Sequence, residues 1–585
     1  MRFPSVDLLT ERAVGVARRF PWTIAVAVIA AAAAIVAVDH QTNEDRWAAI
    51  ALVATLGLPA TIGLALMGEA RRWSGALRTG IQLAALAGLV AFYFAWPGPD
   101  EKHHAIRYVQ LSASLHLAVA FLPFLGTPDS VGFWQYNRRL FLGFLRAGVF
   151  SAVLFVGLAI ALGALDQLFG VDVDDGAYAR IWFVIALVVN TWIFLAEVPD
   201  DYEALAQDRE YPRALKVFSQ YILTPLVFTY LVILLAYLVK IVIGAEWPSG
   251  WIGWLVTSVA VAGLLGFLLV HPLRSDPDEG WIRIYARWLF IGLIPASLML
   301  LVAFWKRILP YGFTELRTLG FLLGFWLLGI AILFSIRRGA AIRIIPITLA
   351  FLLLVTLYGP VSLTSISLSS QENRLASLLP TAPANADDAR EASAALRFLM
   401  DHDAQGSIES AIGQEIPDLA LDTMPRYSAV RDSVATDIMA LAGAPYVQQY
   451  FRTEANDYFY INAEPTTATR VSGHDWVVGV SANDISVRMA GADSVQVLSD
   501  TTSGVTRIRV GSDTLRFDVS ALAAVLADSL PPDRMVTADR LRLESTSGSW
   551  RGTLLLSTLT GKRREDRGME VGNWHGSLLL ARPEE

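Results

Sequence analysis

Residues 218–243 read FSQYILTPLVFTYLVILLAYLVKIVI and contain one charged side chain, Lys240. A helix rises about 1.5 Å per residue, and the hydrocarbon core of a bilayer is about 30 Å thick, so about 20 apolar residues cross it. The stretch is therefore long enough to span a membrane as a helix. The same pattern recurs along the chain as far as residue 360.

Ten further apolar stretches bring the number of predicted membrane-spanning helices to eleven. The predicted spans are 22–38, 48–67, 77–96, 106–125, 141–165, 180–197, 218–243, 251–271, 287–304, 316–335 and 341–360. The fourth and sixth are the least apolar, because Gln110 and His116 interrupt one and Asn190 interrupts the other. The basic residues before the first span would also suit a cleaved signal peptide. However, the sequence Asp39-His40-Gln41 after it offers no small-residue cleavage site.

The composition of the whole chain agrees with a membrane protein. Of its 585 residues, 54% are hydrophobic and 17% are charged, whereas soluble proteins average about 25% charged residues. The chain contains no cysteine, which excludes disulfides, thiolate nucleophiles and cysteine-ligated zinc or iron–sulfur sites. The net charge of −7 argues against a nucleic-acid partner, because phosphate binding needs clustered positive charge. We expect no cofactor and no metal site, and the lipid bilayer is the expected partner.

The distribution of lysine and arginine predicts the orientation, because these residues are retained on the cytoplasmic side. With a cytoplasmic N-terminus, nineteen of them lie in cytoplasmic segments and eight in the opposite loops. The eight are Arg46, Lys102, Arg107, Arg180, Lys240, Lys306, Arg307 and Arg317. Because eleven is odd, the C-terminal part is expected beyond the bacterial inner membrane, in the periplasm or outside the cell. The loss of one weak span would reverse its side.

The part of the chain after residue 360 is hydrophilic, with thirty acidic and twenty basic residues. Residues 374–445 have helical patterns, and 456–581 alternate with a period of two, which is typical of strands. Residues 510–514 read VGSDT and have the spacing of a hairpin loop. The predicted fold is therefore a polytopic α-helical membrane bundle over residues 1–360, followed by a soluble α+β extracytoplasmic domain over 361–585.

Polar side chains inside the predicted spans are candidates for a functional site, because placing them in lipid is costly. His116 and Asn190 lie deepest, and Glu197 follows Asn190 by two helical turns on the same face. With Lys240, near the end of its span, they form the candidate intramembrane site. A proton or ion path would require them to converge. An interhelical hydrogen bond for each polar group is the simpler interpretation.

Other chemical motifs are weak. The acidic segment 197–211 and the sequence Asp100-Glu101-Lys102-His103-His104 have metal-ligand types of side chain, but the first lacks the spacing of a calcium loop. A solvated charged loop is the preferred interpretation of the first. The tail has no nucleophile elbow, zinc-protease motif or phosphate-binding loop. His402, His474 and His575 are dispersed and favour surface or core positions over catalysis.

A series of short motifs between residues 211 and 379 carries a resemblance to a known family. The motifs are Tyr211-Pro212-Arg213, Gln220–Leu226, Leu235–Lys240, Glu246–Trp251, Arg287-Trp288, Trp305–Ile308, Tyr311–Arg317, Gly359–Ser362 and Ser369–Leu375. In their order and spacing, this region resembles the uncharacterised bacterial integral-membrane family known as domain of unknown function 4153. The resemblance implies a polytopic bacterial inner-membrane protein, and it supplies no catalytic residues.

Charged residues in two of these motifs suggest a second candidate site. Lys306, Arg307, Glu315 and Arg317 lie in one predicted exterior loop, and Glu246 lies with Lys240 at another. We expect these residues to form an exterior ion-pair cluster beside the beginning of the tail. This arrangement would explain why basic residues occur on the side of the membrane where few are expected.

These observations favour a non-enzymatic envelope protein, whose membrane bundle anchors a periplasmic domain that binds or senses an envelope protein or lipid. The alternative is a secondary transporter that uses the intramembrane polar residues, although no internal repeat supports it. A third interpretation is an enzyme acting on lipid-linked substrates, with Lys306, Arg307 and Arg317 contacting phosphate. The sequence nominates no catalytic residue.

Overall fold

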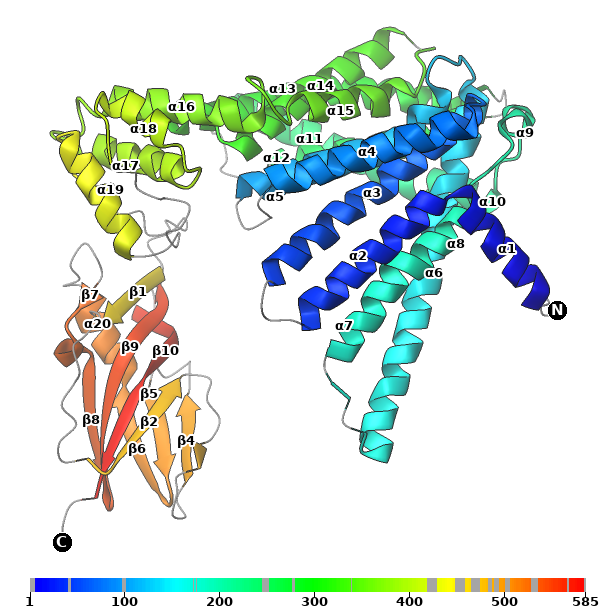
Figure 1. Cartoon of the computed structure of the whole chain (residues 1–585). Coiled ribbons are helices and arrows are strands. Elements are labelled where there is room, and N and C mark those ends of the chain that lie inside the picture. The colour runs from blue at the N-terminus through cyan, green and yellow to red at the C-terminus, as the bar shows by residue number, and fades with distance from the viewer. Residues whose placement is uncertain are drawn as a thin grey trace. The chain divides into compact units, whose positions relative to one another are not determined.

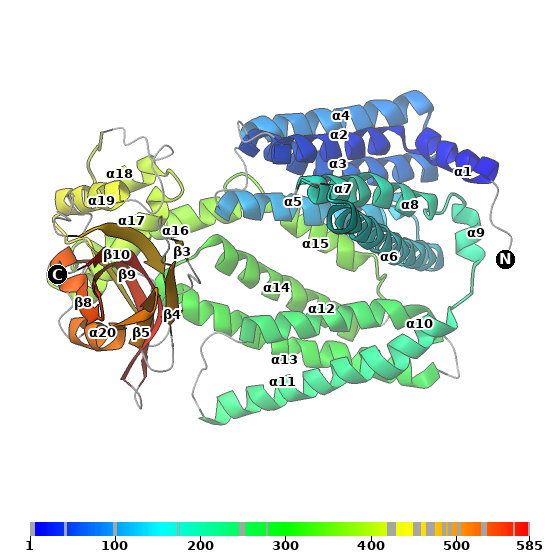
Figure 2. The ribbon, with the colours of Figure 1, turned by 90° about the horizontal axis from the view of Figure 1, so that it is seen from below.

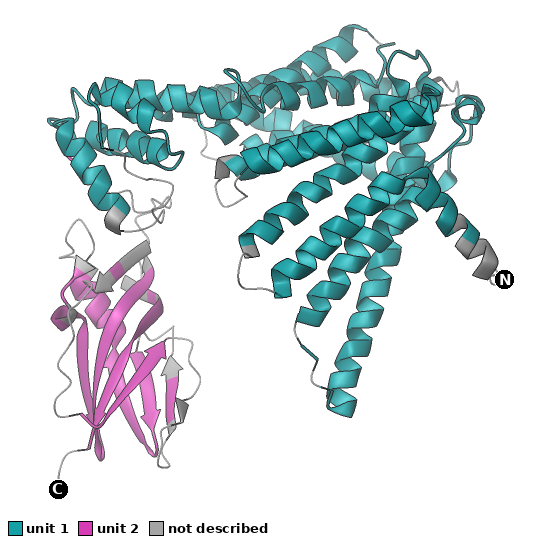
Figure 3. Cartoon of the chain, in the orientation of Figure 1, with its two compact units in different colours: residues 1–444 teal, residues 445–585 magenta. Residues whose placement is uncertain are grey.

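The computed structural model describes sixteen ranges of the chain. They are residues 6–39, 44–96, 102–171, 173–174, 176–244, 252–275, 279–337, 339–417, 429–447, 458–463, 474–481, 487–488, 494–499, 505–527, 535–564 and 568–582. The chain divides into two compact units, Met1–Ala444 and Pro445–Glu585 (Figure 3). The boundary falls after the change in composition near residue 360, because the helices that follow that change pack with the apolar ones.

All the secondary-structure elements described in the first unit are helices (Figure 1). Its helices in the apolar part are α1 Val6–Arg19, α2 Pro21–Asp39, α3 Glu44–Ala70, α4 Gly75–Ala95, α5 Lys102–Phe121, α6 Ser130–Phe169, α7 Gly176–Phe183, α8 Asn190–Ala196, α9 Tyr202–Gln207, α10 Arg213–Val217, α11 Thr224–Gly244, α12 Ile252–Val270, α13 Gly280–Tyr311, α14 Glu315–Ile336 and α15 Ile344–Val355. Two π-helical turns, Val184–Val189 and Phe218–Leu223, join α7 to α8 and α10 to α11.

Ten helices in the described residues are long and apolar enough to cross a membrane. They coincide with the first ten predicted spans, and several extend beyond them; α6 has 40 residues, a length of about 60 Å. The eleventh predicted span, 341–360, contains only the 12-residue helix α15. That helix ends at Val355, and Gly359, with a left-handed φ of 85°, and Pro360 lie between it and the next helix.

The apolar helices pack as two groups joined through a middle layer (Figure 2). Figure 2 shows α2, α3 and α4 at one side, α11–α14 at the other, and α5, α6 and α15 between them. Close packing in the second group is centred on three phenylalanine rings. Phe267 lies 4.8 Å from Phe290 and 5.4 Å from Phe334, and Phe290 stacks on Phe334 at 4.9 Å, all between ring centroids.

Four more helices follow α15 and complete the first unit. They are α16 Leu363–Leu378, α17 Ala386–Met400, α18 Gln405–Ile412 and α19 Ala429–Leu441, and we call them the helical module. Ser362 caps α16 by accepting a hydrogen bond from Ser365 N, and Asn385 caps α17 in the same way. Figure 1 shows α16 extending beyond the bundle to α17 and α18.

The second unit is rich in β-strands and has two sheets. Its elements are β1 Tyr458–Ala463, β2 Trp476–Ser481, β3 Val487–Arg488, β4 Ser494–Ser499, β5 Val505–Val510, β6 Asp513–Asp518, α20 Val519–Ala527, β7 Met535–Val536, β8 Arg542–Ser547, β9 Trp550–Arg564 and β10 Gly568–Ala581. One sheet has the order β2-β10-β9-β1-β7, with β8 also paired to β9, and the other has the order β3-β4-β5-β6. Among the strand pairs of the described residues, β1–β7 is parallel and the others are antiparallel.

The two sheets share one hydrophobic core. Ile508, Leu515 and Phe517 of the smaller sheet are buried together with Leu554 and Leu578 of the larger one. The predicted hairpin at 510–514 is confirmed, because Val510 pairs with Asp513 and leaves a two-residue turn. Gly511 occupies that turn with a φ of 59°, a conformation that glycine adopts without strain. The second unit therefore has its own packed interior.

Candidate functional site

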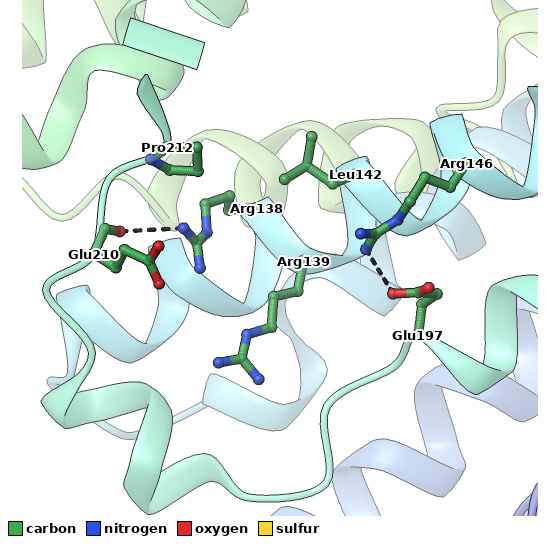
Figure 4. A pocket seen from close by; sticks show the side chains of 7 residues that line it. All are labelled: Arg138, Arg139, Leu142, Arg146, Glu197, Glu210 and Pro212. Carbon is green, nitrogen blue, oxygen red and sulfur yellow. Dashed lines mark hydrogen bonds and ion pairs between the residues drawn. The ribbon is translucent and has the colours of Figure 1, made fainter. Parts of the chain in front are cut away.

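A pocket of about 360 Å³ lies between the beginning of α6 and the segment that joins α8 to α10 (Figure 4). It is lined by Arg138, Arg139, Leu142, Arg146, Glu197, Glu210 and Pro212, and we call it the arginine pocket. The helix α6 begins where the carboxylate of Asp129 accepts hydrogen bonds from Val131 N and Gly132 N. Arg138, Leu142 and Arg146 then follow at four-residue spacing and share one helix face.

The opposite wall of the arginine pocket is the acidic segment that the sequence predicts as a solvated loop. Two of its carboxylates, those of Glu197 and Asp208, contact the arginines instead. Arg146 Nη2 lies 2.5 Å from Glu197 Oε2. Asp208 Oδ2 lies 3.4 Å from Arg138 Nη2 and 3.3 Å from Arg139 Nη2, so one oxygen is shared between two guanidinium groups.

The hydrogen bonds of the arginine pocket are incomplete. Arg138 Nη1 donates to the carbonyl oxygen of Glu210 at 3.1 Å, but its buried Nε has no partner among the described residues. The side chain of Arg138 is 9% exposed, whereas those of Arg139 and Arg146 are 42% and 51% exposed. An arginine has five N–H donors. The pocket therefore presents guanidinium donors that the surrounding carboxylates do not saturate.

A second polar site joins the bundle to the helical module, and we call it the junction. It consists of the connection between α13 and α14 with Ser370, Gln371 and His402. Gln371 Nε2 donates to the carbonyl oxygens of Tyr311 at 3.0 Å and Phe313 at 2.9 Å. Ser370 Oγ accepts from Phe313 N at 3.0 Å. Gln371 is 3% exposed, so these hydrogen bonds are made away from water.

The second half of the junction is a buried acid–imidazole pair. His402 Nε2 lies 2.5 Å from Glu315 Oε1, and the two side chains are 8% and 7% exposed. His402 Nδ1 lies 2.7 Å from the carbonyl oxygen of Phe398. Burial lowers the pKa of His402, but the hydrogen bond and charge of Glu315 outweigh burial and raise the pKa above its usual 6.5. Both ring nitrogens face acceptors, which favours the imidazolium form.

The four residues of the candidate intramembrane site lie apart on three helical segments. His116 of α5 is exposed, and its Nδ1 lies 2.8 Å from the carbonyl oxygen of Ser112 on the same helix. Lys240 of α11 is also exposed. Asn190 and Glu197 both face α6, where they contact Ser151 at 3.3 Å and Arg146. These last two share a helix face, as their spacing predicts.

The structure describes four of the five residues of the expected exterior cluster. Glu246 lies outside the described residues, and Lys306 and Arg307 are exposed on α13. Arg317 Nη1 donates to the carbonyl oxygens of Tyr311 and Gly312, both at 3.2 Å. Glu315 pairs with His402. The loop is therefore next to the beginning of the tail, as expected, but its carboxylate pairs with a histidine of the helical module.

The sequence analysis named Glu197 and Glu315 as candidates, but it missed the residues that they contact at the two sites. Arg138, Arg139 and Arg146 entered it only as indicators of orientation, although their spacing on one face near a span end is a signal for a basic cluster. His402 is a single histidine without a motif. Its partner Glu315 is 87 residues away, so only the folded chain shows that they meet.

A family model described as domain of unknown function (DUF4153) matches residues 23–387. The chain belongs to this family. The matched region contains the arginine pocket and Gln371, whereas His402 lies beyond it. An uncharacterized protein, PM1469, from Pasteurella multocida (strain Pm70) is similar, with 23% identity over 233 residues, or 39% of this chain and 38% of that protein. The chain thus matches about two fifths of this relative's length. No solved structure matches the chain.

Proposed function

We propose that this DUF4153 member is a non-enzymatic protein of the bacterial inner membrane that binds or senses an envelope component with its C-terminal part. The N-terminus is cytoplasmic, the chain crosses the membrane eleven times, and residues from α16 onward lie in the periplasm or outside the cell. The junction carries this proposal. A domain that senses needs a firm connection to its membrane anchor, and the buried contacts of Gln371 and His402 provide one.

The eleventh crossing is made by α15 together with the first half of α16. Arg343, which precedes α15, lies beside Pro128 and Asp129 at the α5–α6 end of the bundle. Gln110 of α5 donates to Thr356 Oγ1 at 3.0 Å, part of the way along. Gln371 then contacts the α13–α14 connection. These contacts support a chain that passes from one end of the bundle to the other between residues 343 and 371.

The distribution of basic residues supports the orientation. Arg138, Arg139 and Arg146 lie at the α5–α6 end of the bundle. They are three of the nineteen lysine and arginine residues counted in the predicted cytoplasmic segments. The opposite end holds the junction. By the positive-inside rule, the junction and the helical module lie outside the cytosol.

The absence of cysteine from the sequence makes a direct test simple. Single cysteines are introduced by Ala376→Cys in the exposed part of α16 and Glu203→Cys in the exposed part of α9. A maleimide that does not cross membranes should label the Ala376→Cys variant in intact spheroplasts. It should label the Glu203→Cys variant only after lysis. The reverse pattern would place the tail in the cytosol and remove the proposal.

A sensing role has its own test. A cross-link from the C-terminal part to an envelope component should be recovered from intact cells. In the native protein, binding of that component should change how well the α13–α14 connection is protected from protease. The Gln371→Ala variant should still form the cross-link, but binding should no longer change this protection. If binding of the envelope component to the C-terminal part does not change the protease protection of the α13–α14 connection in the native protein, the chain is an anchor and not a sensor. The transporter alternative would instead require solute uptake that depends on Asn190.

A further inference from the structure

The arginine pocket holds positive charge beside an apolar surface. Leu142 lines the pocket, and Leu145, Val149 and Val153 follow it three, seven and eleven positions later on the same face of α6. These three side chains are 45%, 60% and 67% exposed. In a helix that crosses a membrane, such a stripe contacts acyl chains. A lipid lying along α6 would therefore place its headgroup at the arginine pocket.

The donors of the pocket match a phosphate group. Arginine binds phosphate through two parallel N–H···O bonds, and it does so better than lysine because its donors form a rigid fork. Arg139 has a long contact of 3.3 Å to a carboxylate oxygen that it shares with Arg138. Arg146 uses one amino group for Glu197. Both side chains therefore keep donors for an incoming anion, and Arg138 is held behind them by the backbone of Glu210.

The pocket also offers a place for a positive group. The carboxylate of Glu210 lines the pocket, where it attracts the charge of Arg138 but forms no hydrogen bond or salt bridge with the described residues. A ligand with phosphate alone would leave this carboxylate beside a second negative charge. A ligand that carries an ammonium group two carbons from its phosphate would satisfy both the arginines and Glu210. The volume of about 360 Å³ falls within the range of about 300–1,000 Å³ that ligand pockets occupy.

We propose that the arginine pocket binds a phosphoethanolamine group, with the phosphate on Arg139 and Arg146 and the ammonium on Glu210. The apolar stripe on α6 favours a phospholipid as the source of this group over a soluble phosphate ester. Arg138 is a positioning residue that holds the segment around Glu210 against α6. The site lies at the opposite end of the bundle from the junction, so it stands whether or not the tail senses anything.

The experiment measures lipid binding to the full-length chain in detergent after delipidation. The probes are phosphatidylethanolamine, phosphatidylcholine and diacylglycerol with identical acyl chains, together with free phosphoethanolamine and inorganic phosphate. Bound lipid is counted by native mass spectrometry, and the thermal unfolding midpoint gives a second readout. We expect phosphatidylethanolamine to bind at least about tenfold more tightly than diacylglycerol, since each charge-assisted hydrogen bond contributes about that factor.

Three variants and one control separate the contributions. Arg139→Gln should weaken phosphatidylethanolamine binding about tenfold, and Arg139→Lys should restore only part of it, because lysine keeps the charge without the fork. Glu210→Gln should abolish the preference for ethanolamine over choline while phosphate binding remains. Arg72→Gln is the matched control, because Arg72 forms an exposed ion pair with Glu203 outside the pocket. Without lipid, the thermal unfolding midpoint of each variant should match that of the native protein.

The outcomes are distinct. Lipid binding that depends on Arg139 and Glu210, and that free phosphoethanolamine displaces only at much higher concentration, supports the proposal with its lipid source. If free phosphoethanolamine binds tightly and its binding also depends on Arg139 and Glu210, the pocket is supported, but a phospholipid is not the source of the group. Equal binding of diacylglycerol and phosphatidylethanolamine overturns the proposal. So does an Arg72→Gln control that loses as much affinity for phosphatidylethanolamine as the Arg139→Gln variant. If the Arg139→Gln variant does not fold, Arg146→Gln provides the same comparison.

Discussion

The carboxylate of Glu315, at the first residue of α14, lies 2.5 Å from the imidazole of His402, which follows α17. This contact joins the apolar bundle to the helical module through two side chains that are almost fully buried. Charged groups in such a place are stabilised only when they are paired, so the protonation state of His402 matters for the attachment of the module.

The pH dependence of the junction follows from the raised pKa of His402. In the unfolded chain the ring titrates near 6.5, so below that pH it is protonated in both states and the pair contributes its full stabilisation. As the pH rises through the higher folded-state pKa, the imidazolium is lost and the stabilisation with it. We expect hydrogen exchange in α17 and α18, corrected for the intrinsic rate, to increase as pH rises above 6.5.

Glu315, Asp401 and the carbonyl of Phe398 are the groups that act on the charge of His402. The His402→Gln variant should therefore lose most of the pH dependence, because glutamine still donates to Glu315 but does not titrate in this range. An unchanged pH profile in that variant would show that another group controls the exchange.

Gln371 should be important for the stability of the junction. The change Gln371→Ala leaves the carbonyl oxygens of Tyr311 and Phe313 without the hydrogen bonds that they now accept. Removing one partner of a buried hydrogen bond costs about 1–3 kcal/mol. Thermal unfolding in detergent should show that loss. Asn373→Ala is the control, because Asn373 is exposed on the same helix and bonds only to Ser369 O, and it should change stability by less than about 0.5 kcal/mol.

Arg19 should stabilise the other end of the bundle. Its Nε and Nη2 bind both oxygens of Glu69 at 3.1 and 2.8 Å, and its Nη1 and Nη2 also donate to the carbonyl oxygens of Val198 and Pro199. Lysine cannot reproduce this fork, so Arg19→Lys should lower the free energy of unfolding by about 1–3 kcal/mol.

The control for this change is Arg18→Lys at the exposed neighbouring position. Chemical denaturation of the two variants in the same detergent should separate them. Equal midpoints would mean that the Arg19 contacts do not contribute measurably to stability.

The close backbone approach at Gly576 should make the second unit sensitive to a single methyl group. A Cβ atom at Gly576 would lie 2.3 Å from the carbonyl oxygen of Leu555 on the paired strand β9. The strand cannot move away without losing ladder hydrogen bonds, so Gly576→Ala should destabilise this unit by at least about 1–3 kcal/mol.

Gly479 in the neighbouring strand β2 provides the comparison, because a Cβ atom there has no neighbour within 4 Å. Gly479→Ala should be neutral or slightly stabilising. Limited proteolysis of the full-length protein measures both variants, and a Gly576→Ala protein as resistant as the native one would contradict the packing described.

The apolar stretches and the local turns of this protein could be predicted from the sequence, because each depends on residues that are close together in the chain. Transfer of a continuous run such as 218–243 into lipid is decided by its own composition and length. The hairpin at Gly511 is decided by which residues tolerate a positive φ. Helices in the residues before 445 and strands after 456 followed from the same local periodicities.

The tertiary structure alone decided where the compact units divide and which polar groups meet. The helical module packs with the apolar bundle because Gln371 and His402 find buried partners at the α13–α14 connection. Arg138 and Arg139 meet Asp208 about seventy positions later in the chain, in a segment whose own composition predicts only a solvated loop. Such contacts arise from the packing of whole helices, and no local sequence pattern encodes the distance between side chains that the fold brings together.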